Sequence, residues 1–334
     1  MKALLVGGTG LIGTGIVKHL LARGASVTVY SRARRGATMA PGVEHVEGDR
    51  SDATTFARTF ERSRYDVVID MICFTPAEAE VTARVFGGRC DQLEFCSTVC
   101  TYGVKVPANV LIDERVPQEP TTSYARDKLA CEEVFRRAAD QRRFHLTIVR
   151  PSHTYGPGAS LVDQLEFDGP VWDRVARGLP ILCAGDGLGL WQSTHRDDCG
   201  KLFAHAALEP RTYGEAYNAT RDETFTWREY YRRAAAALDA RARLVFVPAA
   251  WLLGAAPGRF PFLGEITQFH GAYSSAKARS HVPAFDPTTT LEHGARETFA
   301  DVRRRGAWRD STADVEYDRL VTAAIGMGFP VVDA

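Results

Sequence analysis

Short hydrophobic runs alternate with longer amphipathic stretches in the first half of the chain. Six runs have the length and composition of buried strands: Ala3–Val6, Ser26–Tyr30, Val43–Glu47, Val67–Met71, Gln92–Cys96 and Leu146–Arg150. Four stretches between them repeat their apolar residues at helical spacing: Gly13–Arg23, Ala53–Ser63, Glu78–Phe86 and Tyr124–Gln141. Strand alternating with helix predicts an α/β fold, a doubly wound parallel sheet with helices on both faces.

The pattern loosens after residue 155, where Pro and Gly interrupt the chain repeatedly. Helical spacing returns at Val171–Arg177, Asp198–Leu208, Trp227–Leu238 and Leu291–Arg305. We therefore predict a sheet domain over residues 1–160, to which the chain returns around 190–220. Residues 161–334 are expected to form mainly a smaller α/β substrate lobe. Because ligands of doubly wound folds bind at the carboxyl edge of the sheet, the lobe should cover that edge.

Composition and charge narrow the functional classes. Among 334 residues, 41 basic side chains balance 41 acidic ones, which argues against a nucleic-acid partner. Seven scattered cysteines show no metal-knuckle or redox spacing, so we expect reduced thiols and no metal site. No apolar run is long enough to span a membrane, and the first one is too short for a signal peptide. These features predict a cytoplasmic protein with no membrane partner.

The strongest local motif is the glycine-rich run Gly7-Gly8-Thr9-Gly10-Leu11-Ile12-Gly13. It follows the first predicted strand and opens the first predicted helix. Glycines at this spacing permit a tight turn, a close approach of the backbone to a pyrophosphate, and close packing of helix on strand. The free N–H groups of the helix would face the phosphates. The motif predicts a Rossmann-type dinucleotide site that includes Gly7, Thr9, Gly10, Leu11, Ile12 and Gly13.

The residues at the ends of the second and third predicted strands indicate how the ribose and the adenine of the cofactor would be bound. No acidic residue ends the second strand, where Ser31 and Arg32 are followed by Arg34 and Arg35. Guanidinium groups match phosphate oxygens, so this stretch favours the 2′-phosphate of NADP over NAD, although a solvated basic loop is the alternative. In Gly48-Asp49-Arg50, Asp49 is placed to approach the adenine or to cap the next turn. Asp49 and Arg50 join the predicted cofactor-binding residues.

A tyrosine and a lysine lie one helical turn apart in Tyr124-Ala125-Arg126-Asp127-Lys128. A cation beside a tyrosine favours the phenolate and lowers the pKa of the phenol. The same lysine can hydrogen-bond a ribose of the cofactor. Hydroxyl groups at the end of the fifth predicted strand, in Ser97-Thr98, can bond a substrate alcohol or carbonyl near the tyrosine.

With these motifs the chain resembles an extended short-chain dehydrogenase/reductase of the NAD-dependent epimerase/dehydratase family. The resemblance extends over nearly the whole chain and includes Arg150–Pro157, Gly185-Asp186-Gly187, His195–Asp198 and Ser275–Arg279. It implies that Tyr124 is the acid/base, that Lys128 orients the nicotinamide ribose, and that Thr98 occupies the catalytic hydroxyl position. It also implies a nucleotide-linked sugar as substrate and a homodimer. Val99 and Cys100 replace the elimination residues of the family's dehydratases, which disfavours that branch.

Cys100 matches the position of an acid/base cysteine in some epimerases of the family, where a thiol near a positive charge removes a proton beside a ketone. Its alternative is a small buried residue that fills space beside the cofactor. The partner histidine or lysine of those enzymes is missing around Glu166, so His153 is a substitute candidate or a residue that shapes the pocket. The predicted substrate-binding residues are Thr98, His153, Glu166, Trp191 and His195. The alternative for Trp191 is packing in the core, and the alternative for His195 is a contact at the end of a strand.

These observations favour an NAD(P)-dependent epimerase of a nucleotide-linked sugar that works through a keto-sugar intermediate. The first alternative is an NADPH-dependent reductase of a keto-sugar or another carbonyl compound. The second is a cofactor-binding regulator or an RNA-associated protein, because Val27–Arg32, Gly48-Asp49-Arg50 and Asp66–Phe74 also resemble atypical family members, including chloroplast RNA-binding relatives. Intact Tyr124 and Lys128 weigh against this last possibility.

Overall fold

The computed structural model describes residues 1–32, 39–105 and 111–334. The chain divides into two compact units. Unit 1 consists of Met1–Thr154, Arg196–Arg221 and Tyr273–Thr288, and unit 2 of Tyr155–His195, Asp222–Ala272 and Thr289–Ala334. The chain therefore returns to unit 1 twice, and the second return, Tyr273–Thr288, has no counterpart in the prediction. This segment contains helix α9 (Ala276–His281).

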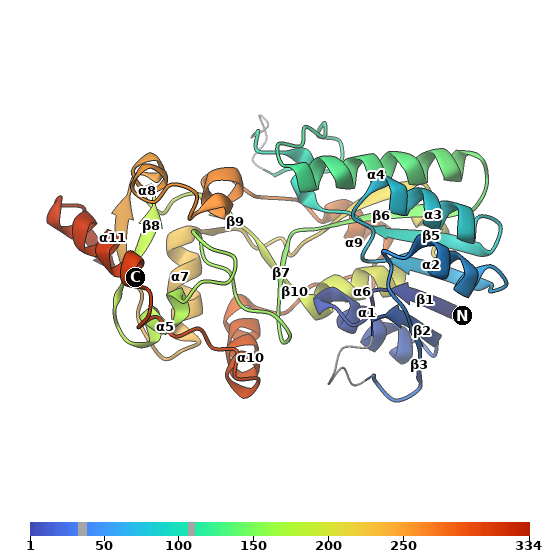
Figure 1. Cartoon of the computed structure of the whole chain (residues 1–334), viewed down its shortest axis with the longest axis horizontal. Coiled ribbons are helices and arrows are strands. Elements are labelled where there is room, and N and C mark those ends of the chain that lie inside the picture. Colours follow the sequence, from blue (N-terminus) through green and yellow to red (C-terminus); the bar gives the residue numbers. More distant parts are fainter. Residues whose placement is uncertain (33–38, 106–110) are drawn as a thin grey trace. The chain divides into compact units, whose positions relative to one another are not determined.

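Unit 1 is built on a parallel sheet of seven strands, in the order β11-β6-β5-β4-β1-β2-β3 (Figure 1). The strands are β1 (Lys2–Val6), β2 (Ser26–Ser31), β3 (Val43–Glu47), β4 (Tyr65–Asp70), β5 (Cys90–Cys96), β6 (His145–Pro151) and β11 (Glu215–Ala219). Every neighbouring pair is parallel. The predicted doubly wound parallel sheet is confirmed. Strand β11 was missed, because its five residues carry no long hydrophobic run.

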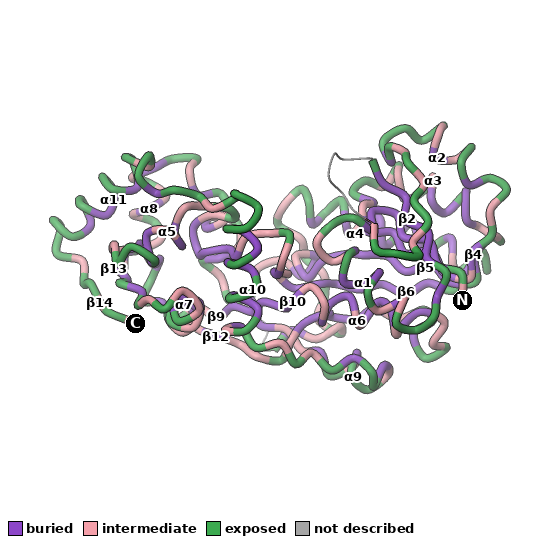
Figure 2. Tube along the Cα trace, turned by 90° about the horizontal axis from the view of Figure 1, so that it is seen from below, coloured by how far each residue is buried: buried purple, intermediate pink, exposed green. Residues whose placement is uncertain are grey.

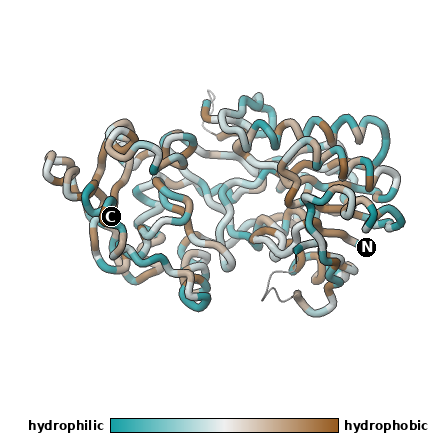
Figure 3. Tube along the Cα trace, in the orientation of Figure 1, coloured by the Kyte–Doolittle hydropathy of each residue, from teal (hydrophilic) through white to brown (hydrophobic). Residues whose placement is uncertain are grey.

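Alternation along the strands explains the two helical layers. On β1, Ala3 and Leu5 pack with α1 (Leu11–Ala22) and α6 (Arg196–Ala206), whereas Leu4 and Val6 pack with the opposite layer. That layer consists of α2 (Ala53–Phe60), α3 (Pro76–Phe86) and α4 (Ser123–Asp140). Six of the strands are largely buried and mostly hydrophobic, whereas the edge strand β3 has no fully buried residue (Figures 2 and 3). Both faces of the sheet are covered, as a parallel sheet requires.

Local sequence signals fix where the helices near the site begin. Helix α3 starts at Pro76 with a complete capping box, in which Thr75 accepts from the Glu78 N–H and the Glu78 carboxylate accepts from the Thr75 N–H. Thr122 caps α4 by accepting from the Ala125 N–H. Between β5 and α4, a short 3₁₀ helix, η1 (Val99–Tyr102), follows Thr98. These starts position the residues that the sequence singled out.

Unit 2 has a small sheet in the order β14-β13-β8, with β14 (Val331–Asp333), β13 (Arg243–Val247) and β8 (Pro180–Ala184). Strands β9 (Leu190–Trp191) and β12 (Phe225–Thr226) form a separate pair. Its helices are α5 (Val171–Ala176), α7 (Trp227–Ala236), α8 (Ala249–Ala255), α10 (Leu291–Arg304), α11 (Val315–Gly326) and a π-helix at Leu263–Thr267. The remaining short elements of the chain are β7 (His153–Tyr155), β10 (Ser193–His195) and η2 (Pro210–Thr212).

The core of unit 2 is rich in aromatic side chains, with Trp172, Trp191, Trp227, Tyr230 and Tyr231 all buried. In the part of the chain that the structure describes, no helix is both long and apolar enough to cross a membrane.

Candidate active site

The glycine-rich turn between β1 and α1 has the backbone geometry that its sequence predicts. Gly7 adopts φ +92°, a conformation that residues with a side chain rarely adopt. A Cβ on Gly13 would lie 2.8 Å from the Gly7 carbonyl oxygen and from the Gly8 backbone, so only glycine fits there. Helix α1 begins after Gly10 without a side-chain cap and without an acidic residue in its first turn. Its first N–H groups are therefore available to an anion.

A pocket of about 420 Å³ opens beside this turn, and all of its lining residues belong to unit 1. Seven predicted cofactor residues line it: Gly7, Thr9, Gly10, Ser31, Arg32, Asp49 and Arg50. Five further lining residues were not predicted, namely Gly48, Ser51, Ile72, Phe74 and Glu78. Ile72 and Phe74 follow β4, and proximity to this strand end is the signal that would have found them. Leu11, Ile12 and Gly13 shape the first turn of α1 instead of lining the pocket.

Two exposed charges face each other at the pocket. Arg32 Nη1 and Asp49 Oδ2 are 3.9 Å apart, with 60% and 47% of their side chains exposed. The backbone N–H and the hydroxyl of Ser51 donate to Asp49, and these hydrogen bonds lower the pKa of its carboxyl. Beside Arg32, the Ser31 hydroxyl lies 3.0 Å from Nε2 of His45 on β3. Arg34 and Arg35, also proposed for a 2′-phosphate, lie outside the described residues.

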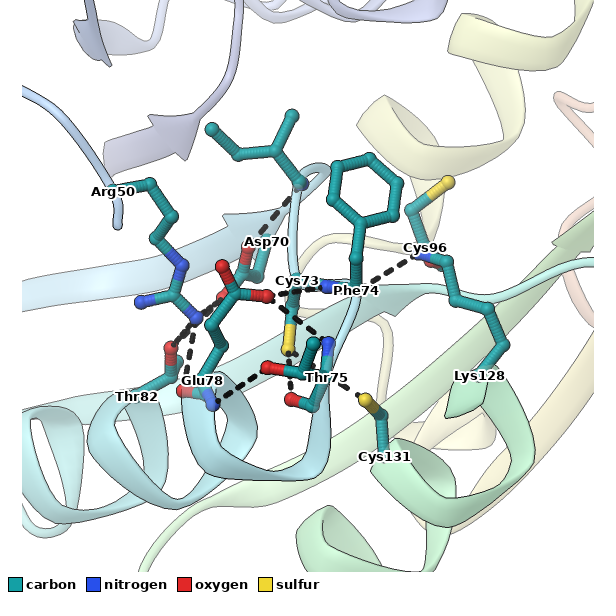
Figure 4. A network of polar contacts seen from close by, with 11 residues as sticks. Arg50, Asp70, Cys73, Phe74, Thr75, Glu78, Thr82, Cys96, Lys128 and Cys131 are labelled. Atoms are coloured by element: carbon teal, nitrogen blue, oxygen red, sulfur yellow. Dashed lines mark hydrogen bonds and ion pairs between the residues drawn. The ribbon is translucent and has the colours of Figure 1, made fainter. Parts of the chain in front are cut away.

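A second ion pair, between Arg50 and Asp70, is buried at the wall of the same pocket. Arg50 Nη2 donates to the Asp70 carboxylate at 3.2 Å, to the Thr82 hydroxyl at 2.7 Å and to the Glu78 carbonyl at 2.9 Å (Figure 4). The Arg50 side chain is 5% exposed and Asp70 is fully buried. This network connects the turn after β3, the end of β4 and the start of α3. Arg50 therefore fixes the relative positions of three segments that line the pocket.

The candidate catalytic hydroxyls lie together on α4 and beside η1. The Thr98 side chain lies beside the Tyr124 phenol, close enough to lower its pKa, and accepts from the Cys100 N–H at 3.2 Å. Although 45% of Tyr124 is exposed, partial burial raises the pKa of its phenol, with Cys96 and Cys100 adding to the effect. The Thr98 side chain opposes the shift. Lys128 does not lower this pKa here, contrary to the expectation from the sequence.

The position of the Lys128 side chain explains why it does not lower the pKa of Tyr124. Lys128 is 1% exposed, and its Nζ donates to the carbonyl oxygens of Cys73 at 2.9 Å and Cys96 at 2.7 Å. The rings of Phe74 and Phe95 lie 4.6 Å and 5.0 Å from the ammonium group. The one-turn spacing of Tyr124 and Lys128 therefore puts both residues on α4, whereas tertiary contacts direct the ammonium into the protein.

Cys100 lacks the environment that an acid/base thiol needs. An acid/base role would need a nearby positive charge that favours the thiolate, but burial raises the pKa of Cys100, and the neighbouring Thr98 side chain only partly offsets this. Tyr273, from the second return of the chain to unit 1, lies nearby, with its ring centroid 6.2 Å from that of Tyr102; burial chiefly raises its pKa, and Cys100 and Tyr102 add to the effect. The surroundings of Cys100 fit the space-filling alternative.

A second buried ionic network lies beneath the catalytic hydroxyls. Arg150 on β6 binds Glu132 on α4 through two hydrogen bonds of 2.9 and 2.6 Å. The Ser97 hydroxyl donates to the same carboxylate at 2.6 Å, and Arg150 also donates to the Tyr102 hydroxyl at 2.9 Å. Tyr102 in turn donates to Asn218 on β11 at 2.9 Å. Glu132 therefore joins α4, which carries Tyr124, to the segment that carries Thr98.

The predicted substrate-binding residues divide between the units. His153 belongs to unit 1, where burial lowers its pKa to about 3, so it is a neutral imidazole. In unit 2, Trp191 stacks on Trp227 with ring centroids 4.8 Å apart, and His195 packs edge-on against Tyr155. Glu166 lies 3.4 Å from Arg259. The core alternative for Trp191 matches its 7% exposure.

The arrangement in unit 1 is that of a dinucleotide enzyme, and comparison with known proteins agrees. A model of the NAD dependent epimerase/dehydratase family matches residues 3–87 and 77–220. The chain belongs to this family. It is an enzyme of the short-chain dehydrogenase/reductase superfamily, as the sequence predicted.

Three similar proteins show the range within and around this family. The 2′-dehydrokanamycin reductase of Streptomyces kanamyceticus is 33% identical over 75% of this chain and 70% of that protein. The chloroplast stem-loop binding protein of 41 kDa b of Arabidopsis thaliana is 23% identical over 96% of this chain and 84% of that protein. The crystal structure of UDP-glucuronic acid 4-epimerase from Bacillus cereus in complex with NAD has a TM-score of 0.72 at 16% identity, covering 91% of this chain and 97% of that chain.

The residues of this family member fit a dinucleotide. The uncapped start of α1 suits the pyrophosphate, and the absence of a Cβ at Gly13 lets α1 approach the turn closely enough to present it. The Asp49 carboxylate can accept from the adenine amino group, and Ser31 and Arg32 lie where the adenosine ribose is expected. The pocket thus suits the adenosine half of the cofactor, with Phe74 at the border toward Lys128.

Proposed function

We propose that this enzyme reduces a keto group on a sugar-like substrate with a nicotinamide cofactor, preferably NADPH. The observation that carries the proposal is the placement of the Tyr124 phenol beside the Thr98 side chain, in surroundings whose burial raises the pKa of the phenol and so favours its protonated form. A reductase needs this proton on its tyrosine at the start of the reaction, whereas alcohol oxidation needs a phenolate. The likeness to 2′-dehydrokanamycin reductase supports the same direction.

The chain's own residues have simple tasks in this reaction. A nicotinamide cofactor held at the site would supply a hydride to the carbonyl carbon. Tyr124 Oη gives its proton to the carbonyl oxygen, so the C=O bond becomes an alcohol. Thr98 is placed to donate a second hydrogen bond to that oxygen while it gains negative charge. Because Tyr124 is 45% exposed, solvent can return the proton to the phenol after the product leaves.

Replacing Tyr124 by Phe tests this assignment. We expect kcat/KM with NADPH and 2′-dehydrokanamycin as the probe ketone to fall about 10²–10⁴-fold, with unchanged NADPH affinity, because only the proton donor is lost. Tyr213→Phe removes a hydroxyl elsewhere in unit 1 and serves as the matched control. The raised pKa also predicts that the wild-type rate falls only above pH ~10, the ordinary pKa of tyrosine, since deprotonation of Tyr124 removes the acid. Full activity of Tyr124→Phe would refute the proposed role.

The second candidate function is epimerisation of a nucleotide-linked sugar, which the family match favours. An epimerase returns the hydride to the substrate, so its cofactor does not need to leave. Denatured protein that releases stoichiometric NAD or NADP, together with interconversion of UDP-glucose and UDP-galactose without added nucleotide, would establish this function. Protein that is purified empty and consumes added NADPH with a ketone would establish the reductase.

A role in RNA association, suggested by the likeness to the chloroplast stem-loop binding protein, makes a different prediction. An RNA-associated function would be unaffected by Tyr124→Phe, because the phenol is needed for proton transfer and not for phosphate contacts. Nucleotide-dependent activity that disappears in this variant excludes a purely binding role. Unchanged RNA binding by the same variant, without any turnover, would favour it.

A further inference from the structure

Lys128 is buried and does not belong to the residues that line the pocket. Its ammonium group makes two short hydrogen bonds to main-chain carbonyls, of Cys73 after β4 and Cys96 at the end of β5. Two aromatic rings cover it further, and only 1% of the residue is exposed. Each of these contacts compensates the charge, so the ammonium is stable where it lies. A ribose hydroxyl in the pocket has no direct access to it.

Phe74 separates this ammonium group from the pocket. Its ring lies 4.6 Å from Lys128 Nζ and also lines the pocket. At 46% exposure it is one of the large hydrophobic side chains left open to solvent. Its position between a buried cation and a pocket, and not its exposure by itself, makes it a candidate for contact with a ligand, because ligand pockets are lined largely by apolar and aromatic side chains.

The backbone that carries Phe74 is held in place from both sides (Figure 4). The Glu78 carboxylate accepts from the Phe74 N–H at 2.7 Å and from the Thr75 N–H at 3.0 Å. Asp70, at the other end of the segment, is fixed by Arg50 and Thr82. Because the backbone is fixed, the ring is the part of this segment that can change position, by rotation about its side-chain bonds.

We propose that Phe74 is a cofactor-positioning residue that acts through Lys128. Its ring covers the ammonium group in the structure. When the nicotinamide half of the cofactor binds, the ring turns aside, and a ribose hydroxyl takes the place of the ring beside Lys128. The inference rests on the proposed function only in that the ligand is a nicotinamide dinucleotide.

The first experiment measures the cover directly in the free, full-length protein. Acetylation of lysines with an N-hydroxysuccinimide ester, followed by peptide mass spectrometry, gives the rate at each lysine. We expect Lys128 to react at least about tenfold more slowly than Lys18 and Lys105, whose side chains are 63% and 78% exposed. Phe74→Ala should raise the Lys128 rate severalfold, and Phe74→Tyr, which keeps the ring, should not. Equal rates at Lys128 in wild type and Phe74→Ala would overturn the proposal.

The second experiment separates a cover from an ordinary wall of the adenosine pocket. Calorimetry compares 2′-phospho-AMP, which ends before the nicotinamide ribose, with NADPH, on wild type, Phe74→Ala and Phe74→Tyr. Removal of a ring that has to be displaced should tighten NADPH binding about threefold or more and change 2′-phospho-AMP binding less than twofold. If the ring is only a wall, Phe74→Ala should weaken both ligands together, and that result would also overturn the proposal.

These outcomes are distinguishable from failure of the proposed function. If the enzyme binds neither nucleotide, the proposed function fails, whereas the acetylation rates still decide whether Phe74 covers Lys128. If it binds NADPH but does not reduce a ketone, both experiments remain valid, because neither depends on turnover. A variant that is unfolded by circular dichroism would be replaced by Phe74→Leu, for which the same changes in rate and affinity are expected.

Discussion

Two ion pairs near the site have opposite properties. Arg32 and Asp49 face each other over 3.9 Å at the pocket, with about half of each side chain in solvent. Arg150 and Glu132 form a two-point pair beneath the catalytic hydroxyls, at 3% and 0% exposure. An exposed pair contributes about 0–1 kcal/mol and is readily exchanged for a ligand contact. A buried pair fixes geometry, because neither charge can be left alone. The exposed pair at the pocket is therefore adaptable, whereas the buried pair beneath the catalytic hydroxyls is rigid.

The largest effect is expected from breaking the buried pair. Glu132→Gln keeps the shape of the side chain but leaves Arg150 without its counter-charge, which costs about 3–5 kcal/mol of the free energy of unfolding. Activity should fall as well, because the link between α4 and the Thr98 segment is weakened. Urea unfolding measures the first effect. The neighbouring exposed residue provides the control, since Glu133→Gln should change stability by less than about 0.5 kcal/mol.

Equal stability of the Glu132→Gln and Glu133→Gln variants would contradict the rigid role of the buried pair. A double variant, Glu132→Leu with Arg150→Leu, removes both charges at once. It should recover part of the lost stability without recovering activity, because hydrophobic replacement removes the uncompensated charge but not the need for hydrogen bonds to Ser97 and Tyr102.

Glu94 adds a third case to this comparison, a buried carboxyl group. It is completely buried on β5, and neither carboxylate oxygen has a hydrogen-bond partner among the described residues. Burial raises its pKa well above the ordinary value, with Arg23 opposing, so the folded protein binds a proton that the unfolded chain releases. Stability should therefore fall as the pH rises above the ordinary pKa of glutamate, about 4.3, by up to ~1.4 kcal/mol per pH unit.

Glu94→Gln removes the titrating carboxyl group and with it this dependence of stability on pH. We expect the variant to gain stability relative to wild type as the pH rises from 5 to 8, measured by urea unfolding at both values. A constant difference between the two proteins across this range would show that Glu94 is not protonated in the folded state. Glu80→Gln, at an exposed position on α3, controls for general charge effects.

The smallest effect on stability, and a selective effect on binding, is expected at the exposed pair. Arg32→Ala should change the free energy of unfolding by less than about 0.5 kcal/mol. It should weaken NADPH about tenfold or more and NADH less than threefold, because a charge-assisted bond to the 2′-phosphate contributes about 1.5–3 kcal/mol. Arg64→Ala breaks an exposed ion pair of similar exposure away from the pocket and should leave both affinities unchanged. Equal losses for NADPH and NADH would remove the argument for NADP.

The sequence was informative wherever chemistry is carried by neighbouring residues. The glycine run, the ends of β2 and β3, and the start of α4 are local signals, and seven of the residues predicted from them line the pocket. Three of the five missed lining residues, Ile72, Phe74 and Glu78, follow β4 and carry no motif of their own. They reach the pocket only because β4 lies next to β1 in the sheet.

What the sequence alone determined is the doubly wound sheet, the phosphate-binding turn and the family, because hydrophobic periodicity and glycine spacing act over short stretches of chain. Tertiary structure decided the states of the reactive groups. The spacing of Tyr124 and Lys128 fixes their place on α4, but contacts with Cys73, Cys96 and Phe74, distant in sequence, turn the ammonium away from the phenol. A pKa and the direction of a side chain depend on burial and on every neighbour in space, and these exist only once the chain has folded.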